Sequence, residues 1–172
     1  MKKSIFTVCA VFLISSFSIA QNGAFNFEDK LLNIGIGINS YYGGGIPLGA
    51  SFEYGLTDDV SVGANIDYLS TKYNGYKFSA FYFGLRASYH FNELLEINKD
   101  NVDVYGGLTI GYRKFSWVNN VYEGTLGKSY ESGVYLGALV GGKYYFSDNM
   151  GAFAELVAGG ATNARLGLAF KL

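Results

Sequence analysis

The chain has 172 residues, with 14 acidic and 13 basic side chains, one histidine, one cysteine and one proline. This balance of charge excludes the strongly basic surface that a nucleic-acid-binding protein needs. Charged residues make up only 16% of the chain, while glycine, tyrosine and phenylalanine contribute 24, 15 and 14 residues. Few charges together with many glycines and aromatics are typical of a barrel whose outside contacts lipid.

The first twenty residues have the three regions of a secretory signal peptide. A basic start (MKK) precedes an apolar run (SIFTVCAVFLIS), and SIA ends in a small-residue cleavage site. The apolar run is short for a membrane-spanning helix, which needs about 20 residues. We therefore predict cleavage after Ala20 and a short N-terminal tail over 21–30. Because Cys9 lies in the signal peptide, the mature chain has neither a disulfide framework nor a thiolate metal site.

Eight stretches of the remaining sequence alternate between apolar residues and small or polar ones. Such alternation predicts β-strands, because successive side chains of a strand point to opposite faces. In FYFGLRASYHF (81–91), for example, Phe81, Phe83 and Leu85 share one face and Arg86 lies on the other. The expected strands are 31–42, 46–56, 60–72, 77–91, 102–116, 129–146, 150–159 and 163–172. Nearly all reach the 9–11 residues that a tilted strand needs to cross a bilayer.

The connections between these stretches suggest two different rims. LTDDV (56–60) and FSDNM (146–150) read as tight turns built on Asp and Asn, and their similarity places them on one rim. The other rim is expected to hold the connections near 41–46, 70–77, 118–129 and 159–163. The segment NELLEINKDN (92–101) is long for the tight-turn rim. Its apolar residues could form an amphipathic turn at a membrane surface, which the sequence alone does not decide.

The polar faces of the expected strands carry a nearly balanced set of charges. We predict that these form an ionic network in the lumen: Glu53, Asp67, Asp103 and Glu155 with Arg86, Arg113, Lys143, Arg165 and Lys171. A closed interior tolerates paired charges, whereas an unpaired one is costly. Eight strands enclose a lumen that side chains can fill. The expected fillers are Tyr82, Tyr105, Tyr135, Tyr145 and Phe153.

Aromatic residues gather near both ends of the expected strands. One set is Tyr41, Tyr42, Tyr68, Tyr73, Tyr76, Phe78, Phe115, Trp117 and Tyr130. The other is Tyr54, Tyr89, Phe91, Tyr144, Phe146 and Phe170. We interpret both sets as interfacial girdles, with the apolar sides of the strands facing lipid. The alternative is that they are strand-favouring aromatics of a soluble β-sandwich.

The signal peptide, the eight alternating stretches, the Asp-rich turns and the final RLGLAFKL together resemble the family of small eight-stranded outer-membrane β-barrels. This porin-like family includes adhesion- and defence-associated barrels and the transmembrane domain of the major outer-membrane structural protein. The resemblance implies an all-β, antiparallel up-and-down transmembrane barrel over 31–172, in the cell outer membrane of a double-membraned bacterium. It also implies membrane lipids and the barrel insertion machinery as partners. Such chains usually end in an aromatic residue, whereas this one ends in Leu172 with Phe170 on the same face.

Catalytic chemistry is not expected. A lipid-modifying barrel enzyme would need a base near the outer rim with a serine and an acid as partners, but His90 falls near the rim of tight turns, which is the periplasmic side in barrels of this type. With one histidine and no mature cysteine, no zinc site is expected, and no cofactor is predicted. We expect a structural or surface-interaction role, in which Tyr73, Tyr76, Trp117 and Tyr122 contact a surface ligand or host partner. A small ion channel, a lipid-modifying enzyme and a soluble lipocalin-like carrier remain as alternatives.

Overall fold

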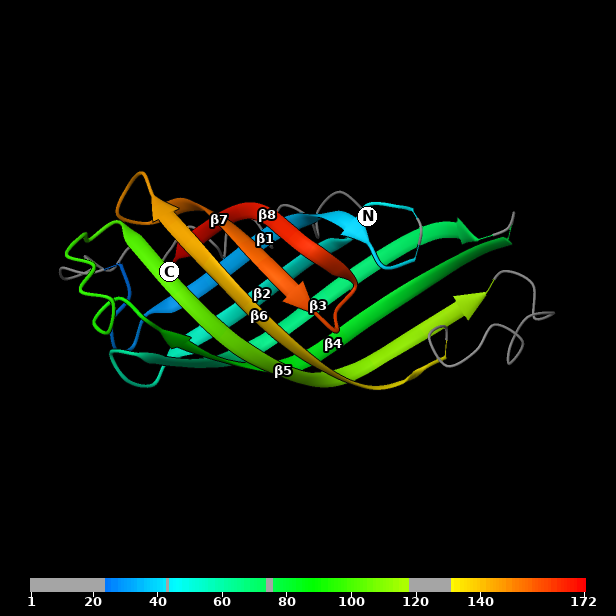
Figure 1. Ribbon diagram of the computed structural model, residues 1–172, viewed down its shortest axis with the longest axis horizontal. Coiled ribbons are helices and arrows are strands. Elements are labelled where there is room, and N and C mark those ends of the chain that lie inside the picture. Colours follow the sequence, from blue (N-terminus) through cyan, green and yellow to red (C-terminus); the bar gives the residue numbers. More distant parts are fainter. Residues whose placement is uncertain (1–23, 43, 74–75, 118–130) are drawn as a thin grey trace, which may run out of the picture.

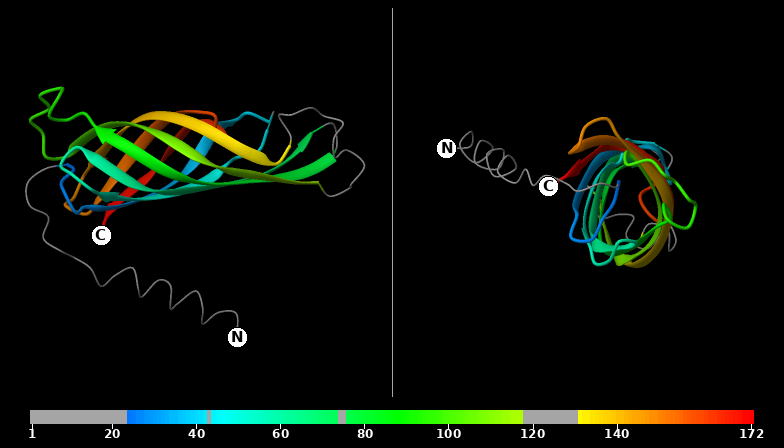
Figure 2. Two further views of the ribbon diagram at one scale, coloured as in Figure 1. Left: turned by 90° about the horizontal axis from the view of Figure 1, so that it is seen from below. Right: turned by 90° about the vertical axis from the view of Figure 1, so that its left-hand side faces the viewer.

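The computed structural model describes residues 24–42, 44–73, 76–117 and 131–172. They form a closed antiparallel barrel in which each strand pairs with its sequence neighbours and β8 returns to β1 (Figures 1 and 2). The strands are β1 Lys30–Ser40, β2 Leu48–Gly55, β3 Val60–Tyr73, β4 Tyr76–His90, β5 Val102–Trp117, β6 Gly133–Tyr145, β7 Met150–Ala158 and β8 Thr162–Lys171. This confirms the predicted eight-stranded up-and-down barrel. Among the described residues, no helix is long and apolar enough to cross a membrane.

The two ends of the barrel differ in shape. We call the end that holds the start of β1, the end of β8 and the turns at 56–59 and 146–149 the base, and the opposite end the crown. At the crown, β3, β4 and β5 run on beyond the other strands (Figure 1). They have 14, 15 and 16 residues, against 8 in β2 and 9 in β7.

The two tight turns of the base share one hydrogen-bond pattern, as their similar sequences suggested. In the first, the amides of Leu56 and Thr57 both donate to the carbonyl of Val60, at 2.8 and 3.2 Å. In the second, the amides of Phe146 and Ser147 both donate to the carbonyl of Met150, at 3.1 Å each. Each turn is completed by a side-chain hydroxyl, of Thr57 or of Ser147, that accepts an amide hydrogen bond. Both turns lie on the same rim, as predicted.

The long connection 92–101 also lies at the base, where it forms successive turns rather than a helix. Asn92 ties it to β5, since its side-chain oxygen accepts a hydrogen bond from the Val104 amide at 2.8 Å. Leu94 and Leu95 are exposed, so the connection does present an apolar surface.

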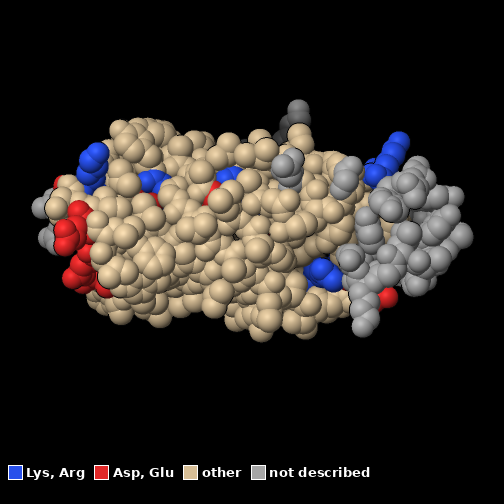
Figure 3. Space-filling view, viewed as in Figure 1, with Lys and Arg blue, Asp and Glu red and all other residues tan. Residues whose placement is uncertain are grey.

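Large apolar side chains cover the outside of the barrel wall. The most exposed of them include Leu85, Leu108, Val134, Leu136 and Leu156. Figure 3 shows that the middle of this face consists almost entirely of uncharged residues, whereas charged ones gather at the two ends. A soluble carrier would have the opposite arrangement, with apolar side chains directed into the barrel and charges outside.

The predicted aromatic girdle at the crown is partly wrong, because Tyr42, Phe78 and Phe115 point into the barrel and are buried. For Tyr42 the reason is an irregularity in β1. The pairing of β1 with β8 shifts on both sides of Asn39, and the strand ends at Ser40. Such a bulge changes the face on which later side chains lie.

Candidate functional site: the lumen

The centre of the lumen is organised around Arg86 on β4. Its Nε lies 3.1 Å from Oε2 of Glu53 on β2, and its Nη2 lies 2.8 Å from Oε1 of Glu155 on β7. All three side chains are almost inaccessible to solvent. Arg86 therefore joins β4 to β2 through an ion pair and to β7 through a charge-assisted hydrogen bond, which is stronger than a neutral one.

Arg165 on β8 extends this group toward β3. Its Nη1 lies 3.4 Å from Oε2 of Glu155, and its Nη2 pairs with Asp67. Gly49 makes room for the pair of Arg165 with Asp67, because a Cβ added at this glycine would lie 3.0 Å from Cζ of Arg165. The alternating order of charges, Glu53–Arg86–Glu155–Arg165–Asp67, places every carboxylate next to a guanidinium.

A second ionic group lies nearer the base. Asp103 on β5 accepts a hydrogen bond from Nζ of Lys143 at 2.9 Å, and its other carboxylate oxygen lies 2.7 Å from Nδ1 of His90. Tyr105 contacts both groups, since its ring centre lies 4.1 Å from the Lys143 ammonium and its hydroxyl donates to Glu155 at 3.0 Å. The two groups thus fill the middle and lower lumen with paired charges.

His90 has two hydrogen-bond partners, Ser61 and Asp103, that the sequence did not assign to it. Oγ of Ser61 lies 3.0 Å from Nε2 of His90, and Asp103 holds the opposite ring nitrogen. This is the hydrogen-bond order of a serine hydrolase triad. However, Ser61 also donates to Glu53 at 3.1 Å, and all three side chains are buried. Strand alternation could have indicated the cluster, because the three residues occupy inward positions near the base ends of β3, β4 and β5.

The base of the lumen is closed by residues 24–29, which precede β1. The Phe25 ring stacks on His90 with the ring centroids 3.4 Å apart. The amide of Gly55 donates to the Asp29 carbonyl at 2.9 Å, and the Asp29 carboxylate lies 3.3 Å from Nζ of Lys171. These six residues show no periodicity in the sequence, so alternation could not have indicated that they close the barrel.

The crown half of the lumen is closed by aromatic rings instead of charges. Its buried cluster consists of Tyr42, Leu69, Phe78, Ala80, Tyr82, Phe115, Tyr135 and Ala161. The hydroxyls of Tyr42 and Tyr82 are hydrogen-bonded, and the rings of Tyr82 and Tyr135 meet edge to face at 5.1 Å. Asn65 connects this cluster to the polar centre, because its side-chain amide donates to the Tyr135 hydroxyl at 3.2 Å.

A cavity in the lumen beside Asp67, Glu155 and Arg165 has a volume of about 20 Å³. This volume accommodates roughly one water molecule. The predicted fillers Tyr82, Tyr105, Tyr135, Tyr145 and Phe153 are all buried in the lumen.

Most of the charged residues predicted for the lumen come together in the two groups described above, and Lys171 joins the base through Asp29. Arg113 lies apart, in the crown, where its Nε donates to the Glu131 carbonyl at 3.2 Å. Its guanidinium carbon lies 5.9 Å from the centre of the Phe115 ring.

Of the four residues predicted to contact a partner, Trp117 lies at the end of β5 rather than in a loop. Its ring centroid is 4.9 Å from that of Phe78, so it packs against the crown cluster. Tyr73 and Tyr76 pair with each other at the ends of β3 and β4, and their side chains lie outside the described part of the structure. Tyr122 also lies outside the described residues.

Several solved structures share this architecture. The N-terminal β-barrel domain of Pseudomonas aeruginosa OprF matches with a TM-score of 0.56 and 20% identity, over 88% of this chain and all of that domain. The fold is that of the small outer-membrane barrels. The outer-membrane protein OprG from Pseudomonas aeruginosa matches with a TM-score of 0.58 and 12% identity, over 88% of this chain and 99% of OprG. A de novo designed transmembrane β-barrel also matches, with a TM-score of 0.52 and 13% identity, over 86% of this chain and 98% of the design. No family model and no curated protein matches the sequence.

Proposed function

We propose that the protein is an integral outer-membrane barrel with a sealed lumen, which serves as a structural or surface-interaction protein through its crown. The observation that carries this proposal is the filling of the lumen. Phe25 closes the base, paired charges occupy the middle, and the aromatic cluster closes the crown. Export by the predicted signal peptide would deliver the chain to the outer membrane of a double-membraned bacterium.

Placement in a bilayer is supported by the outside of the wall. A closed barrel pairs the backbone groups of all its strands, which is the condition for spanning hydrocarbon with β-structure. The outward side chains at mid-wall, such as Leu85, are apolar and more than half exposed. Both properties fit a wall that contacts fatty-acyl chains.

Fractionation of cells, combined with one substitution, tests this placement. The full chain is expected in the outer-membrane fraction, with heat-modifiable migration on cold SDS gels. Leu85→Arg should lower the free energy of unfolding in lipid vesicles by about 2–4 kcal/mol, the cost of an arginine at the bilayer midplane. The control is Leu56→Arg, at the tight turn of the base, for which a clearly smaller loss is expected. Recovery as a soluble monomer without detergent would contradict the placement.

The small ion channel is the main alternative, and the charged middle of the lumen is the observation in its favour. Single-channel recording in planar bilayers separates the two functions. The sealed barrel should give no discrete conductance, because Phe25 and the crown cluster block both ends. A reproducible single-channel conductance from the purified protein would establish the channel instead.

The hydrogen-bond order Ser61–His90–Asp103 calls for a separate test of hydrolase activity. We propose that these residues are structural, because a nucleophile has to reach its substrate and Ser61 is fully buried. A fluorophosphonate probe is therefore expected to leave the folded protein unlabelled. Labelling that Ser61→Ala abolishes would show an enzyme.

A further inference from the structure

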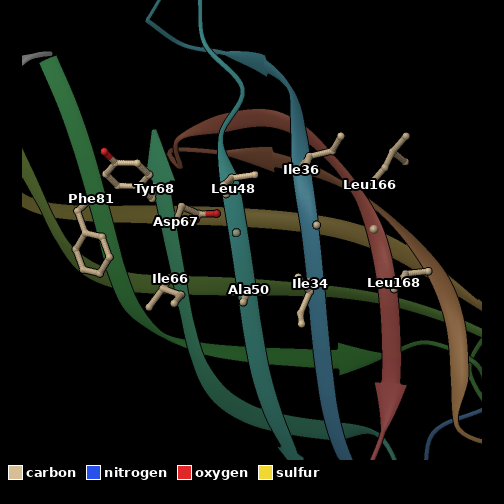
Figure 4. Close-up of a pocket in the computed structure, with 13 residues that line it drawn as sticks. Ile34, Ile36, Leu48, Ala50, Ile66, Asp67, Tyr68, Phe81, Leu166 and Leu168 are labelled. Atoms are coloured by element: carbon tan, nitrogen blue, oxygen red, sulfur yellow. The ribbon is translucent and has the colours of Figure 1, made fainter. Parts of the chain in front are cut away.

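A groove runs across the outside of the wall where β8, β1, β2, β3 and β4 lie side by side (Figure 4). Its volume is about 720 Å³. One edge is a row of side chains that follow each other in register across the five strands: Leu166, Ile36, Leu48, Tyr68 and Phe81. In the opposite edge, Ala50 leaves a low point between Ile34 and Ile66, as Figure 4 shows.

The floor of the groove lies between the two rows and is mostly backbone. Gly167, Gly35 and Gly49 stand in register there, followed by Asp67, whose side chain points into the lumen. The groove therefore exposes hydrocarbon side chains and almost no polar group. It belongs to the apolar outside of the wall that the proposed function places against acyl chains.

Three lysines lie at the end of this groove that points toward the crown. Lys114 on β5 pairs in register with Phe81, so it is the next residue of the first row. Lys72 and Lys77 pair with each other on β3 and β4. They lie four residues beyond Tyr68 and Phe81, or roughly 13 Å along the strands. All three side chains are exposed, and none forms an ion pair with a described carboxylate.

We propose that the groove and these lysines together bind a phosphate-bearing lipid of the outer leaflet, with an acyl chain in the groove and the anionic headgroup against Lys72, Lys77 and Lys114. The inference rests on the proposed function, in which the crown faces the outside of the cell. Charge complementarity favours an anionic headgroup, since each lysine near such a surface adds attraction. A neutral lipid would fill the groove equally well but would leave the lysines without a counter-charge among the described residues.

The lysines also argue against a second copy of the chain as the occupant. A symmetric dimer within a membrane has its two-fold axis along the membrane normal, so the same heights of both barrels face each other. Contact through this groove would then bring the two sets of lysines together, which is unfavourable for like charges.

Native mass spectrometry of the full chain in detergent tests the headgroup contact, with bisphosphorylated lipid A as the probe. The comparison ligand is its monophosphorylated form, which has the same acyl chains and one phosphate fewer. Replacing both Lys72 and Lys77 by glutamine should weaken binding of the bisphosphorylated probe about tenfold, because two favourable charges are lost. The control replaces Lys30 and Lys99, two exposed lysines at the base, by glutamine and should bind like the unchanged protein.

A second pair of variants tests the acyl contact. Ala50→Phe fills the low point of the groove and should also weaken binding about tenfold, whereas Ala154→Phe, at an exposed position on β7, should not. Four outcomes would each overturn the inference. They are equal binding by the lysine variant and its control, unchanged binding by Ala50→Phe, displacement of the probe by inorganic phosphate alone, and dimers in place of lipid adducts.

Every variant is first checked for heat-modifiable migration. If the unchanged protein is not a folded outer-membrane barrel, the proposed function is refuted. If it is folded but the variants bind lipid like their controls, only the lipid site is refuted.

Discussion

The two halves of the lumen are filled in different ways by the same strands. On β4, the inward residues near the base are His90 and Arg86, whereas those near the crown are Tyr82 and Phe78. The charges of the lower half find partners on other strands, so Arg86 reaches both β2 and β7. The rings of the upper half also reach other strands, Tyr42 to Phe115 and Tyr82 to Tyr135, but they meet mainly through ring packing. The lower half therefore depends on the correct registration of several strands at once, while the upper half depends on volume.

The largest expected effect comes from breaking the ionic half. Arg86→Ala should lower the free energy of unfolding by about 3–5 kcal/mol, because it leaves Glu53 and Glu155 buried beside one positive charge fewer. Urea unfolding in lipid vesicles, followed by the gel shift, measures this loss. Arg113→Ala in the crown is the matched control, with an expected loss of about 1 kcal/mol. Equal losses for the two variants would show that the halves do not differ as described.

A smaller effect is expected where the ionic half meets the base. Phe25→Ala removes the ring stacked on His90 and should cost about 1–2 kcal/mol of stability, with aromatic stacking contributing part of it. The more telling readout is chemical. Modification of His90, the only histidine, by diethyl pyrocarbonate should become several-fold faster.

The control for this variant is Phe27→Ala, since Phe27 is more than half exposed. It should change neither stability nor modification rate appreciably. If His90 reacts equally fast in the unchanged protein, residues 24–29 do not close the base in solution.

The smallest loss of stability is expected from a substitution in the crown. Tyr82→Phe removes the hydrogen bond to Tyr42 but keeps the ring, and should cost about 1 kcal/mol, the typical net value of a buried hydrogen bond. The same urea titration applies, with Tyr144→Phe on the outside of the wall as the control. A loss as large as that of Arg86→Ala would mean that the crown, too, is held by polar contacts.

Alternation predicted the strands and, within them, which face each residue occupies, because a strand has a strict period of two. It placed Glu53, Arg86 and Glu155 inside the barrel correctly. It could not say that Arg86 joins the other two, since Glu155 lies 69 residues away in sequence and the contact depends on how the strands are staggered around the ring.

The error in the crown girdle has two separate causes. Phe78 and Phe115 lie on the inward face by simple counting along β4 and β5, so alternation already indicates that they are buried. Tyr42 could not have been placed by counting, because the bulge near Asn39 shifts the alternation. Residues 24–29 lie outside any strand, so no pattern of alternation applied to them.

The pairing of β1 with β8 affects both the assembly of the barrel and its breakdown by proteolysis. The Leu172 amide donates to the Lys30 carbonyl at 2.9 Å, and Asp29 pairs with Lys171, so the two termini of the described fold meet at one seam. Synthesis delivers the last strand after all the others, and until it arrives the ring has two free edges. A cut within β8 would remove a neighbour from both β7 and β1, so proteolysis there should open the whole cylinder instead of fraying one end.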